Sequence, residues 1–316
     1  MDLSIIIVSW NVAALLEQCL KSIQASLAAP SAYPQPKTEV IVVDSASRDD
    51  TVACTQEHFP WVTVLAQTEN VGFTRGNNIG LEAAQGRYLF LLNPDTEIVG
   101  DALARLVVYM NANPKVGVIG PHTLNTDGTT QSSRRRFLTP GLAFFESTWL
   151  QGYAPKEWLD NFYVTQALDT AVLDVDWVQG SAIMVRRDVY TQIGGLDTGY
   201  VMYSEEMDWC KRAKSEGWSI VYYGQAQIIH HGGKSTEQAG ANKHIYFQES
   251  KLRYLRKYHG YPIALIMRMF LLLSYVSQIA LEGVKTIISP KRTMRPERLQ
   301  RIQLYWRVLR SGLRVS

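Results

Sequence analysis

The first half of the chain alternates short, continuous apolar runs with segments of helical periodicity. The apolar runs are residues 3–8, 40–43, 62–65, 88–92 and 116–119. Continuous runs of this kind are typical of strands buried on both faces of a parallel sheet. Helical spacing of apolar residues lies between them, over residues 15–23 and about 75–85. The alternation therefore predicts an α/β fold with a mostly parallel central sheet.

The alternation ends near residue 122. Residues 122–175 carry Arg134-Arg135-Arg136 and many aromatic residues without a clear period, so loops and short elements are expected there. Regular patterns then return. The elements expected after this point are an ordered segment at 175–186, a helix at about 205–216, strands near 220–223 and 227–230, and a helix at about 242–258.

Residues 261–281 are almost entirely apolar, and Arg268 is the only charged residue among them. Their uncharged run, residues 269–281, is shorter than the roughly 20 residues that a membrane-spanning helix needs. Many basic residues follow. This favours C-terminal helices on an anionic membrane surface, an apolar one in the interface and then a polybasic one. Packing on the body or on a second subunit is the alternative, and a full span is less favoured.

Composition and charge divide the chain in the same way. Hydrophobic residues make up 46% and charged residues 19% of 316 residues, an ordinary globular balance that excludes disorder as the main state. Residues 250–316 carry 14 Lys and Arg against 2 acidic residues, whereas residues 1–249 carry 18 against 27. We therefore expect a catalytic body at 1–250 and a basic, apolar tail at 251–316. The tail is half apolar and has no nucleic-acid-binding motif, which favours lipid over nucleic acid.

The cysteines and the N-terminal residues indicate the cellular compartment in which the chain is expected. Cys19, Cys54 and Cys210 are far apart and form no CxxC pair, which fits a reducing compartment. Asp2 stands where a signal peptide would be basic, and the apolar stretch that follows is too short for one. The expected location is the cytoplasm.

Polar residues follow the predicted strands, and ligands of such sheets bind at the carboxyl ends of strands. Ser9 and Asn11 follow the first strand, and Asp44 follows the second. A carboxylate at that point can accept hydrogen bonds from a nucleobase imide or a ribose hydroxyl. A turn-capping aspartate is the alternative for Asp44.

Two further segments suit a diphosphate. Asp95 follows the fourth strand in Asn93-Pro94-Asp95, where it offers a hard oxygen ligand to Mg²⁺ or Mn²⁺. Residues 70–80 gather glycines and asparagines at a helix start with Arg75 in the first turn, which suits phosphate. An ordinary turn and a glycine-rich packing site are the respective alternatives.

The last two candidates offer a base and an imidazole. Glu205, Glu206 and Asp208 place three carboxylates in four residues at a predicted helix start, more than capping needs, so one of them suits a general base. His230 and His231 end a predicted strand before two glycines, which suggests an imidazole presented to a site. A core histidine is the alternative there.

In their joint order these segments, with residues 177–181 and 194–197, resemble the family 2 inverting glycosyltransferases over about residues 1–250. The rhamnosyltransferase-like branch, which builds cell-surface polysaccharides, is the most similar. Two departures stand out. The usual Asp-x-Asp motif reads Asn93-Pro94-Asp95, which removes one carboxylate, and the usual Glu-Asp pair reads Glu205-Glu206, which makes the base one methylene longer.

The resemblance implies a Rossmann-like, nucleotide-binding domain of the GT-A type and a divalent metal, Mg²⁺ or Mn²⁺. It implies transfer of a sugar, rhamnose among the options, from a nucleotide-diphospho-sugar to a hydroxyl of a glycan or lipid-linked glycan. The implied residues are Ser9, Asn11 and Asp44 for the nucleoside; Arg75 and Asn78 for the diphosphate; Gln179 and Gly180 for the donor sugar; Asn93 for the donor in general; Asp95 and His230, or His231 in its place, for the metal; Glu206 as base; and Glu205, Asp208 and Trp209 on the acceptor side.

Two rival functions remain. A nucleotidyltransferase that makes sugar nucleotides usually has a lysine- and glycine-rich segment after the first strand, which Trp10 and its neighbours lack. A sugar-nucleotide-binding protein descended from a transferase would fit Asn93, but Asp95, Glu206 and His230 argue against lost activity. The expected location becomes peripheral, on the inner face of the cell membrane, with homo-oligomers through the C-terminal helices as an option. The sugar, nucleotide and acceptor are not fixed.

Overall fold

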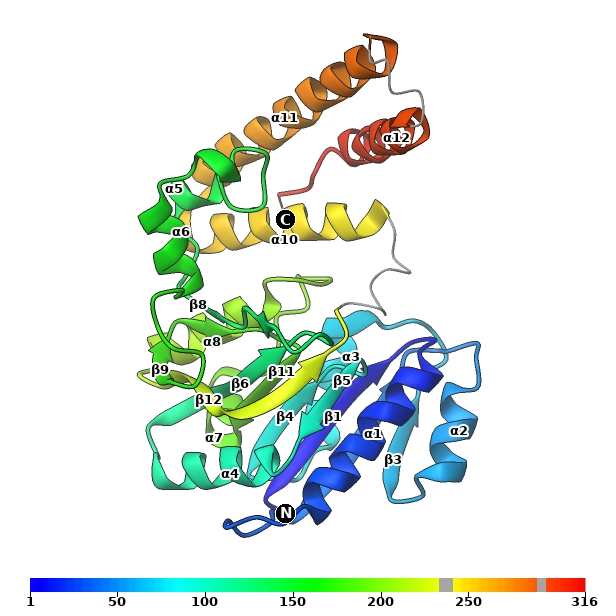
Figure 1. Ribbon diagram of the computed structural model, residues 1–316, viewed down its shortest axis with the longest axis vertical. Coiled ribbons are helices and arrows are strands. Elements are labelled where there is room, and N and C mark those ends of the chain that lie inside the picture. Colours follow the sequence, from blue (N-terminus) through cyan, green and yellow to red (C-terminus); the bar gives the residue numbers. More distant parts are fainter. Residues whose placement is uncertain (233–240, 289–293, 316) are drawn as a thin grey trace. The chain divides into compact units, whose positions relative to one another are not determined.

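The computed structural model describes residues 1–232, 241–288 and 294–315 (Figure 1). They form two compact units. The first comprises residues 1–137, 156–201 and 205–232, and the second comprises 138–155, 202–204 and the described residues from 241 onward. The boundary expected at residue 250 falls inside α10 (Ala241–His259), which lies in the second unit.

The first unit is built on one mixed sheet with the strand order β3-β2-β1-β4-β11-β6-β12-β5. β1, β2, β3 and β4 run parallel, and β6 runs parallel to β12. β11 is antiparallel between β4 and β6, and β5 is antiparallel to β12 at the edge. The strands are β1 Leu3–Ser9, β2 Thr38–Asp44, β3 Val62–Ala66, β4 Tyr88–Leu92, β5 Thr96–Val99, β6 Val116–Leu124, β11 Ala182–Arg186 and β12 Ser219–His230.

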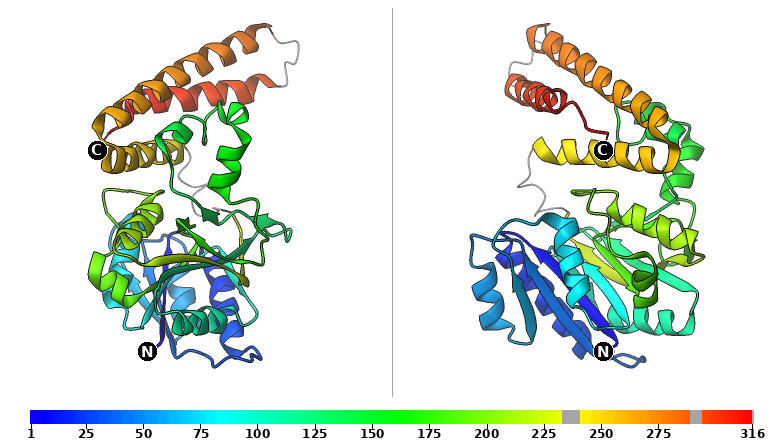
Figure 2. Two further views of the ribbon diagram at one scale, coloured as in Figure 1. Left: turned by 90° about the vertical axis from the view of Figure 1, so that its left-hand side faces the viewer. Right: turned by 180° about the vertical axis from the view of Figure 1, so that it is seen from behind.

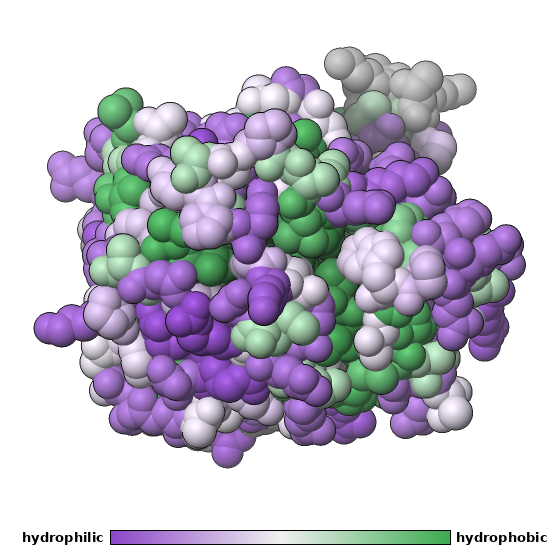
Figure 3. Space-filling view, turned by 90° about the horizontal axis from the view of Figure 1, so that it is seen from below, coloured by the Kyte–Doolittle hydropathy of each residue, from purple (hydrophilic) through white to green (hydrophobic). Residues whose placement is uncertain are grey.

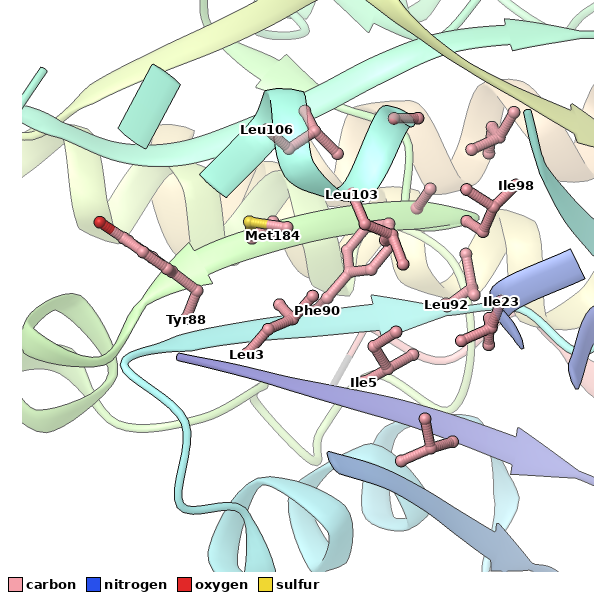
Figure 4. Close-up of a cluster of buried hydrophobic side chains, with 14 of the residues drawn as sticks. Leu3, Ile5, Ile23, Tyr88, Phe90, Leu92, Ile98, Leu103, Leu106 and Met184 are labelled. Atoms are coloured by element: carbon pink, nitrogen blue, oxygen red, sulfur yellow. The ribbon is translucent and has the colours of Figure 1, made fainter. Parts of the chain in front are cut away.

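Helices cover both faces of this sheet, which explains the continuous apolar runs. α1 and α4 pack on one face, and α3, α7 and α8 pack on the other. Figure 4 shows Leu103 of α4 beside Phe90 of β4, and Ile23 of α1 near Leu92 of the same strand. Each such side chain contributes about 1.5–3 kcal/mol when fully buried. The helices of this unit are α1 Ala13–Ala28, α2 Thr51–His58, α3 Gly72–Ala83, α4 Ala102–Ala112, α6 Lys156–Tyr163, α7 Arg187–Ile193 and α8 Glu205–Ser215.

The α/β fold with a mostly parallel centre is confirmed, with differences in detail. The strands expected near 220–223 and 227–230 are one strand, β12, whose pairing with β6 shifts register between Tyr223 and Gln227. β5 and α4 were not predicted. The excursion after residue 122 holds the short elements β7 Thr130–Gln131, β8 Arg134–Arg135, α5 Pro140–Ala143, the 3₁₀ turn Gln151–Tyr153, α6, β9 Val172–Val175 and β10 Trp177–Val178.

The carboxyl ends of the parallel strands carry the polar residues singled out by the sequence. Figure 3 views the molecule from below, the side where β1 begins in Figure 1. Hydrophilic side chains dominate that face and surround a strip of apolar ones. Because β1 begins on this face, its carboxyl end and the candidate site lie at the opposite end of the sheet.

The second unit is helical. α11 (Tyr261–Ile288) runs beside α12 (Arg295–Ser311) and also contacts α10 (Figure 2). The rings of Tyr275 and Tyr305 join α11 to α12 at 5.6 Å between centroids. The buried ammonium of Lys251 lies 3.0 Å from a carboxylate oxygen of Glu146, which ties α10 to the segment that follows α5. The unit thus has an internal core and a buried ion pair of its own.

Candidate active site

The nucleoside end of the site lies where β1 and β2 end side by side. Ser9 and Asp44 are register partners, and Asp44 is 2% exposed. Ser9 Oγ donates to Asp44 Oδ1 at 3.0 Å, and Ser47 donates its backbone N–H to Oδ2 at 2.9 Å and its hydroxyl to Oδ1 at 2.5 Å. Asp44 therefore caps the turn after β2, as the alternative held. Its predicted contact with the nucleoside stays a prediction.

Asn11 fixes the same turn from the β1 side. Its φ of 53° lies in the left-handed region, which asparagine tolerates. Its backbone N–H donates to Ser47 Oγ at 2.9 Å, and its Oδ1 accepts from the backbone N–H of Arg48 at 2.7 Å. The turns after β1 and β2 are thereby held together as one wall.

A cavity of about 520 Å³ opens beside this wall, within the roughly 300–1,000 Å³ of small-molecule sites. Its lining residues are Trp10, Asn11, Ala46, Arg48, Thr68, Glu69 and Asn70. Asn11 was predicted for the nucleoside, whereas the other residues were not singled out for it. The signal for Trp10 was its position between Ser9 and Asn11 at the strand end.

The two residues predicted near the diphosphate differ in their surroundings. Arg75 is exposed in the first turn of α3. Asn78 instead exchanges two hydrogen bonds with the backbone of Leu196, both at 2.9 Å. A Cβ at Gly195 would lie 2.4 Å from Asn78 Oδ1, so only glycine allows this approach. Asn78 thus holds a distant loop to α3, and its contact with a diphosphate remains untested.

Asp95 and His230 meet at the edge of the sheet. β5 pairs antiparallel with β12 and sets Thr96 opposite His230, which brings His230 beside Asp95. Asp95 is 1% and His230 is 6% exposed. His230 Nε2 lies 3.3 Å from Asp95 Oδ1. The His231 side chain instead bonds Glu97 Oε1 through Nε2 at 2.6 Å, while its backbone N–H donates to Asp95 O at 2.9 Å. The imidazole beside the Asp95 carboxylate is therefore that of His230.

The orientation of His230 suits a metal ligand. Its Nδ1 lies 2.7 Å from Gln131 Oε1, and an amide oxygen can only accept, so Nδ1 donates. When the ring is neutral, the lone pair of Nε2 therefore points toward a carboxylate oxygen of Asp95. Two acceptors that face each other at 3.3 Å attract only across a cation or a shared proton. The pair therefore fits a divalent cation.

Two protein ligands leave room for a substrate. Among the described residues no group of three or more His, Cys, Asp or Glu side chains could hold a metal ion. Mg²⁺ is commonly held by one or two carboxylates together with substrate phosphates. Asp95 and His230 match that arrangement.

Asn93 lies between this pair and the rest of the site. Its backbone N–H donates to Ser181 O at 2.9 Å, and its carbonyl accepts from Thr96 Oγ1 at 2.7 Å. Its side-chain Oδ1 is buried and has no hydrogen-bond partner within the described parts of the chain. That oxygen is an acceptor left over for a ligand, as the donor-binding prediction requires.

Glu206 lies over Gly180 at the start of α8. The Glu206 side-chain carbons are 3.5–3.6 Å from where a Cβ of Gly180 would be. Burial raises the pKa of the Glu206 carboxyl, opposed by backbone N–H groups that include that of Gly180 and by the Arg135 guanidinium. A carboxylate with a raised pKa and backbone donors is suited to accept a proton.

Glu205 has a different state. Its side chain is 4% exposed, and burial together with the neighbouring Glu206 carboxylate raises its pKa well above the usual range. Two adjacent buried carboxyls do not both ionise readily. Of the two carboxyls, Glu205 therefore has the stronger tendency to stay protonated, and the assignment of Glu206 as base stays a prediction.

Residues 179–181 connect Glu206 to the segment that carries Asp95. Gly180 touches Glu206, and Ser181 anchors Asn93, two residues before Asp95. Gln179 donates its backbone N–H to Ser133 O at 2.9 Å. The structure thus links Asn93, Gly180 and Glu206 through residues 180 and 181, and their roles toward the donor and the acceptor stay predictions.

Arg135 was not predicted to belong to the site, but its guanidinium is among the groups that lower the pKa of the Glu206 carboxyl. Its guanidinium is 4.6 Å from the ring centroid of Tyr163 and 5.8 Å from that of Trp177. The neighbouring Arg134 is buried and bonds backbone carbonyls such as that of Ala167, at 2.8 Å. The triple arginine was the available signal, but one of the three is structural.

Asp208 and Trp209 do not line an open surface. They are 0% and 1% exposed. Trp209 Nε1 donates to Gly194 O at 2.9 Å, and Asp208 pairs at 2.9 Å with Arg212, whose guanidinium also bonds Gly195 O at 2.7 Å. Both residues thus support the loop at residues 194–196, which Asn78 also holds. Any effect of these two residues on the acceptor would be indirect, through the position of that loop.

Comparison with known proteins identifies the family of this chain. Residues 4–193 match the sequence model described as "Glycosyl transferase family 2". The chain is 25% identical over 270 residues to the N-acetylglucosaminyl-diphospho-decaprenol L-rhamnosyltransferase of Mycobacterium tuberculosis, covering 82% of this chain and 85% of that one. It is 25% identical over 209 residues to the rhamnosyltransferase WbbL of Escherichia coli K12, covering 59% and 70% respectively.

A solved structure shares the fold. The mannosyltransferase PcManGT from Pyrobaculum calidifontis, in complex with GDP-Man and Mn²⁺, superposes with a TM-score of 0.56 at 17% identity, over 98% of this chain and 87% of that one. At this identity the likeness concerns the fold alone. It supports the GT-A-type architecture expected from the sequence.

Proposed function

This chain belongs to glycosyl transferase family 2 and is an inverting glycosyltransferase, and from that premise we propose that it transfers a rhamnosyl or related hexosyl group to a lipid-linked glycan. The donor is a nucleotide-diphospho-sugar, and the acceptor hydroxyl lies on a glycan carried by a lipid diphosphate. The observation that carries the proposal is the approach of Asp95 and His230 to 3.3 Å at the carboxyl end of the sheet. The name of the mycobacterial relative supports the acceptor class.

The reaction follows from the named residues. A sugar hydroxyl is a poor nucleophile, so Glu206 takes its proton as the oxygen attacks the anomeric carbon. In-line displacement breaks the bond to the diphosphate and inverts the anomeric centre. A divalent cation bound by Asp95 and His230 would neutralise the charge that develops on the leaving diphosphate. Exposed Arg75 at the start of α3 supplies a further positive charge for that diphosphate.

The buried Glu205 next to the base supports this assignment. A protonated Glu205 does not compete for the proton of the acceptor and adds no negative charge beside the donor. Asn93 in place of the usual first aspartate removes a second carboxylate from the cation site. The Asn93 side-chain oxygen keeps an acceptor there without the charge.

Membrane association is the second part of the proposal. α11 is long and apolar enough to cross a membrane by length and composition alone, which is weak evidence for a span. Its exposed apolar residues recur at helical spacing, while Met267 and Leu271 are buried. The exposed residues include Ile266, Met269, Leu273, Val276, Val284 and Ile287. We infer a peripheral enzyme on the cytoplasmic face, with exposed arginines of α12, such as Arg301 and Arg307, at anionic headgroups.

The experiment is a donor and acceptor screen with the purified full chain. Thermal shift against a panel of nucleotide sugars, with and without Mn²⁺, identifies the donor because a ligand of the native state stabilises it. The donor is then offered with an N-acetylglucosaminyl diphospho-lipid, and proton NMR reports the anomeric configuration of the product. Transfer with inversion supports the proposal. Donor binding with no transfer to any glycan acceptor would favour a binding protein instead.

A further inference from the structure

We propose that Gln131 is a positioning residue that fixes the tautomer of His230, so that the lone pair of Nε2 faces the cation site beside Asp95. This rests on the metal role of His230 proposed above. Gln131 belongs to β7, whose register with β6 sets it opposite Thr123, and His230 ends β12. The two side chains are 99 residues apart in sequence and meet at 2.7 Å.

The direction of this hydrogen bond is set by the turn between β6 and β7. Asp127 is exposed, and hydrogen bonds from Thr129 lower the pKa of its carboxyl, which is therefore ionised and can only accept. Thr129 Oγ1 lies 2.6 Å from Asp127 Oδ1, so the hydroxyl of Thr129 donates. The lone pairs of that hydroxyl then accept from Asn125 Nδ2 at 2.9 Å.

The same logic continues to the histidine. Asn125 Nδ2 faces Thr129, so Asn125 Oδ1 faces Gln131 and accepts from Gln131 Nε2 at 3.0 Å. Gln131 Oε1 then faces His230 Nδ1, which must donate to it. Each amide is oriented by the one before it. The chain Asp127–Thr129–Asn125–Gln131–His230 leaves the Nε2 atom of the neutral ring without a proton.

The turn that carries these groups is itself well ordered by backbone bonds. The Asn125 N–H donates to Thr129 O at 2.8 Å, and the Gly128 N–H donates to Asn125 O at 3.0 Å, with Gly128 at a φ of 81°. The positive φ favours glycine at this position. A rigid turn next to the sheet edge can thus orient a ligand on another strand. Such outer partners of metal-binding histidines set tautomer and ring orientation.

The first test reads the tautomer directly in the metal-free protein. The probe is ¹⁵N-histidine-labelled full chain, with the His230 signals assigned from a His230→Gln variant, and long-range ¹H–¹⁵N spectra above the pKa of the ring. We expect the proton on Nδ1 in the wild type. In Gln131→Leu it should move to Nε2, the site that neutral histidine favours in water. In Gln131→Glu, which keeps an acceptor oxygen, it should stay on Nδ1.

The second test titrates the full chain with Mn²⁺ alone and follows free Mn²⁺ by electron paramagnetic resonance. Loss of such an outer partner typically weakens metal affinity about 10–100-fold, and we expect this for Gln131→Leu but not for Gln131→Glu. Thr130→Val is the matched control, because Thr130 Oγ1 bonds Asp169 and His122 instead of His230. It should leave both tautomer and affinity unchanged.

The outcomes separate this proposal from the one it rests on. A wild-type proton on Nε2, or a Gln131→Leu variant with unchanged tautomer and affinity, overturns the role of Gln131. Equal losses in Gln131→Leu and Thr130→Val also overturn it, because they would show a general effect on the turn. If Asp95→Ala leaves Mn²⁺ affinity unchanged, the metal site itself fails, and the tautomer spectra still decide whether Gln131 orients His230.

Discussion

The two units place their polar and apolar side chains in opposite ways. In the first unit the carboxylates of Asp44, Asp95 and Glu205 are buried together with the apolar core. In the second unit apolar side chains of α11, such as Leu273 and Val276, stand exposed beside the basic α12. Burying a charge is costly unless it is paired, and a contiguous exposed apolar face is rare in a monomer. The contrast supports the proposal that the first unit holds the chemistry and the second unit holds a contact surface.

A large effect on turnover is expected at the proposed metal ligands Asp95 and His230. Asp95→Ala removes the carboxylate beside His230, and charge stabilisation by a bound cation is worth several kcal/mol. At 1.4 kcal/mol per decade, turnover should fall about 10²-fold or more. Calorimetry with saturating Mn²⁺ should also show weaker donor binding. Asn93→Ala, which removes a neutral acceptor, should lose less, and equal donor affinity for Asp95→Ala and the wild type would contradict the site.

The pH dependence of turnover comes next. Glu206 must be deprotonated to act, and burial raises its pKa above its usual value near 4.5. Turnover should therefore fall about tenfold per pH unit below a midpoint that lies above 4.5. Arg135→Met removes the guanidinium that lowers this pKa. The acidic limb of the pH–turnover profile of this variant should therefore move to higher pH. Initial rates from pH 4.5 to 9 measure it, and a limb that moves to lower pH would count against this arrangement.

A smaller effect is expected for the contact surface. Leu273 and Val276 are 63% and 53% exposed on α11, so replacing both by glutamate should preserve folding and weaken binding to anionic vesicles. Leu168→Glu is the matched control, since Leu168 is 77% exposed in the first unit. Vesicle sedimentation at low and high salt measures both variants. If the double variant still sediments like the control, the apolar face of α11 is not the membrane contact.

The smallest effect concerns the protonated neighbour of the base. The pKa of Glu205 is raised in the folded state, so the folded chain binds more protons than the unfolded chain between about pH 4.5 and that higher pKa. Stability is then lost as the pH rises through this window. Glu205→Gln carries no charge, so its melting temperature should exceed that of the wild type at neutral pH. This difference in melting temperature should vanish near pH 4. A difference that stays the same from pH 4 to neutral pH would show that the ionisation of Glu205 does not cause it.

Much of the fold could be predicted from local pattern. β1 and β4 are continuous apolar runs because helices cover both faces of the sheet, and the sequence shows this directly. β5 was missed because its four residues form no apolar run. α4 had a usable signal, since Leu103, Leu106 and Met110 recur at helical spacing, but it was not predicted. The two expected strands near β12 are one because its register shift keeps the pairing with β6.

The candidate site could be predicted only in part. Asp95 follows the end of β4, and Glu206 lies in the first turn of α8, and both positions carried a local signal for a ligand site. The meeting of Asp95 with His230 depends on the antiparallel return of β12 beside β5, a pairing between residues that are distant in sequence. The burial of Asp208 and Trp209 depends on the loop after α7. The role of Gln131 could not be predicted because its partner, His230, is 99 residues away in the sequence. The two side chains meet only once β7 has paired with β6 in the folded sheet.

The most direct test of the account separates donor binding from turnover in Glu206→Gln. This substitution keeps the shape of the side chain over Gly180 and removes its basicity. The account predicts nearly unchanged donor affinity by calorimetry and a turnover lower by about 10²–10⁴, with Glu57→Gln on the exposed end of α2 as the control. An active Glu206→Gln together with an inactive Glu205→Gln would contradict it and move the base by one residue.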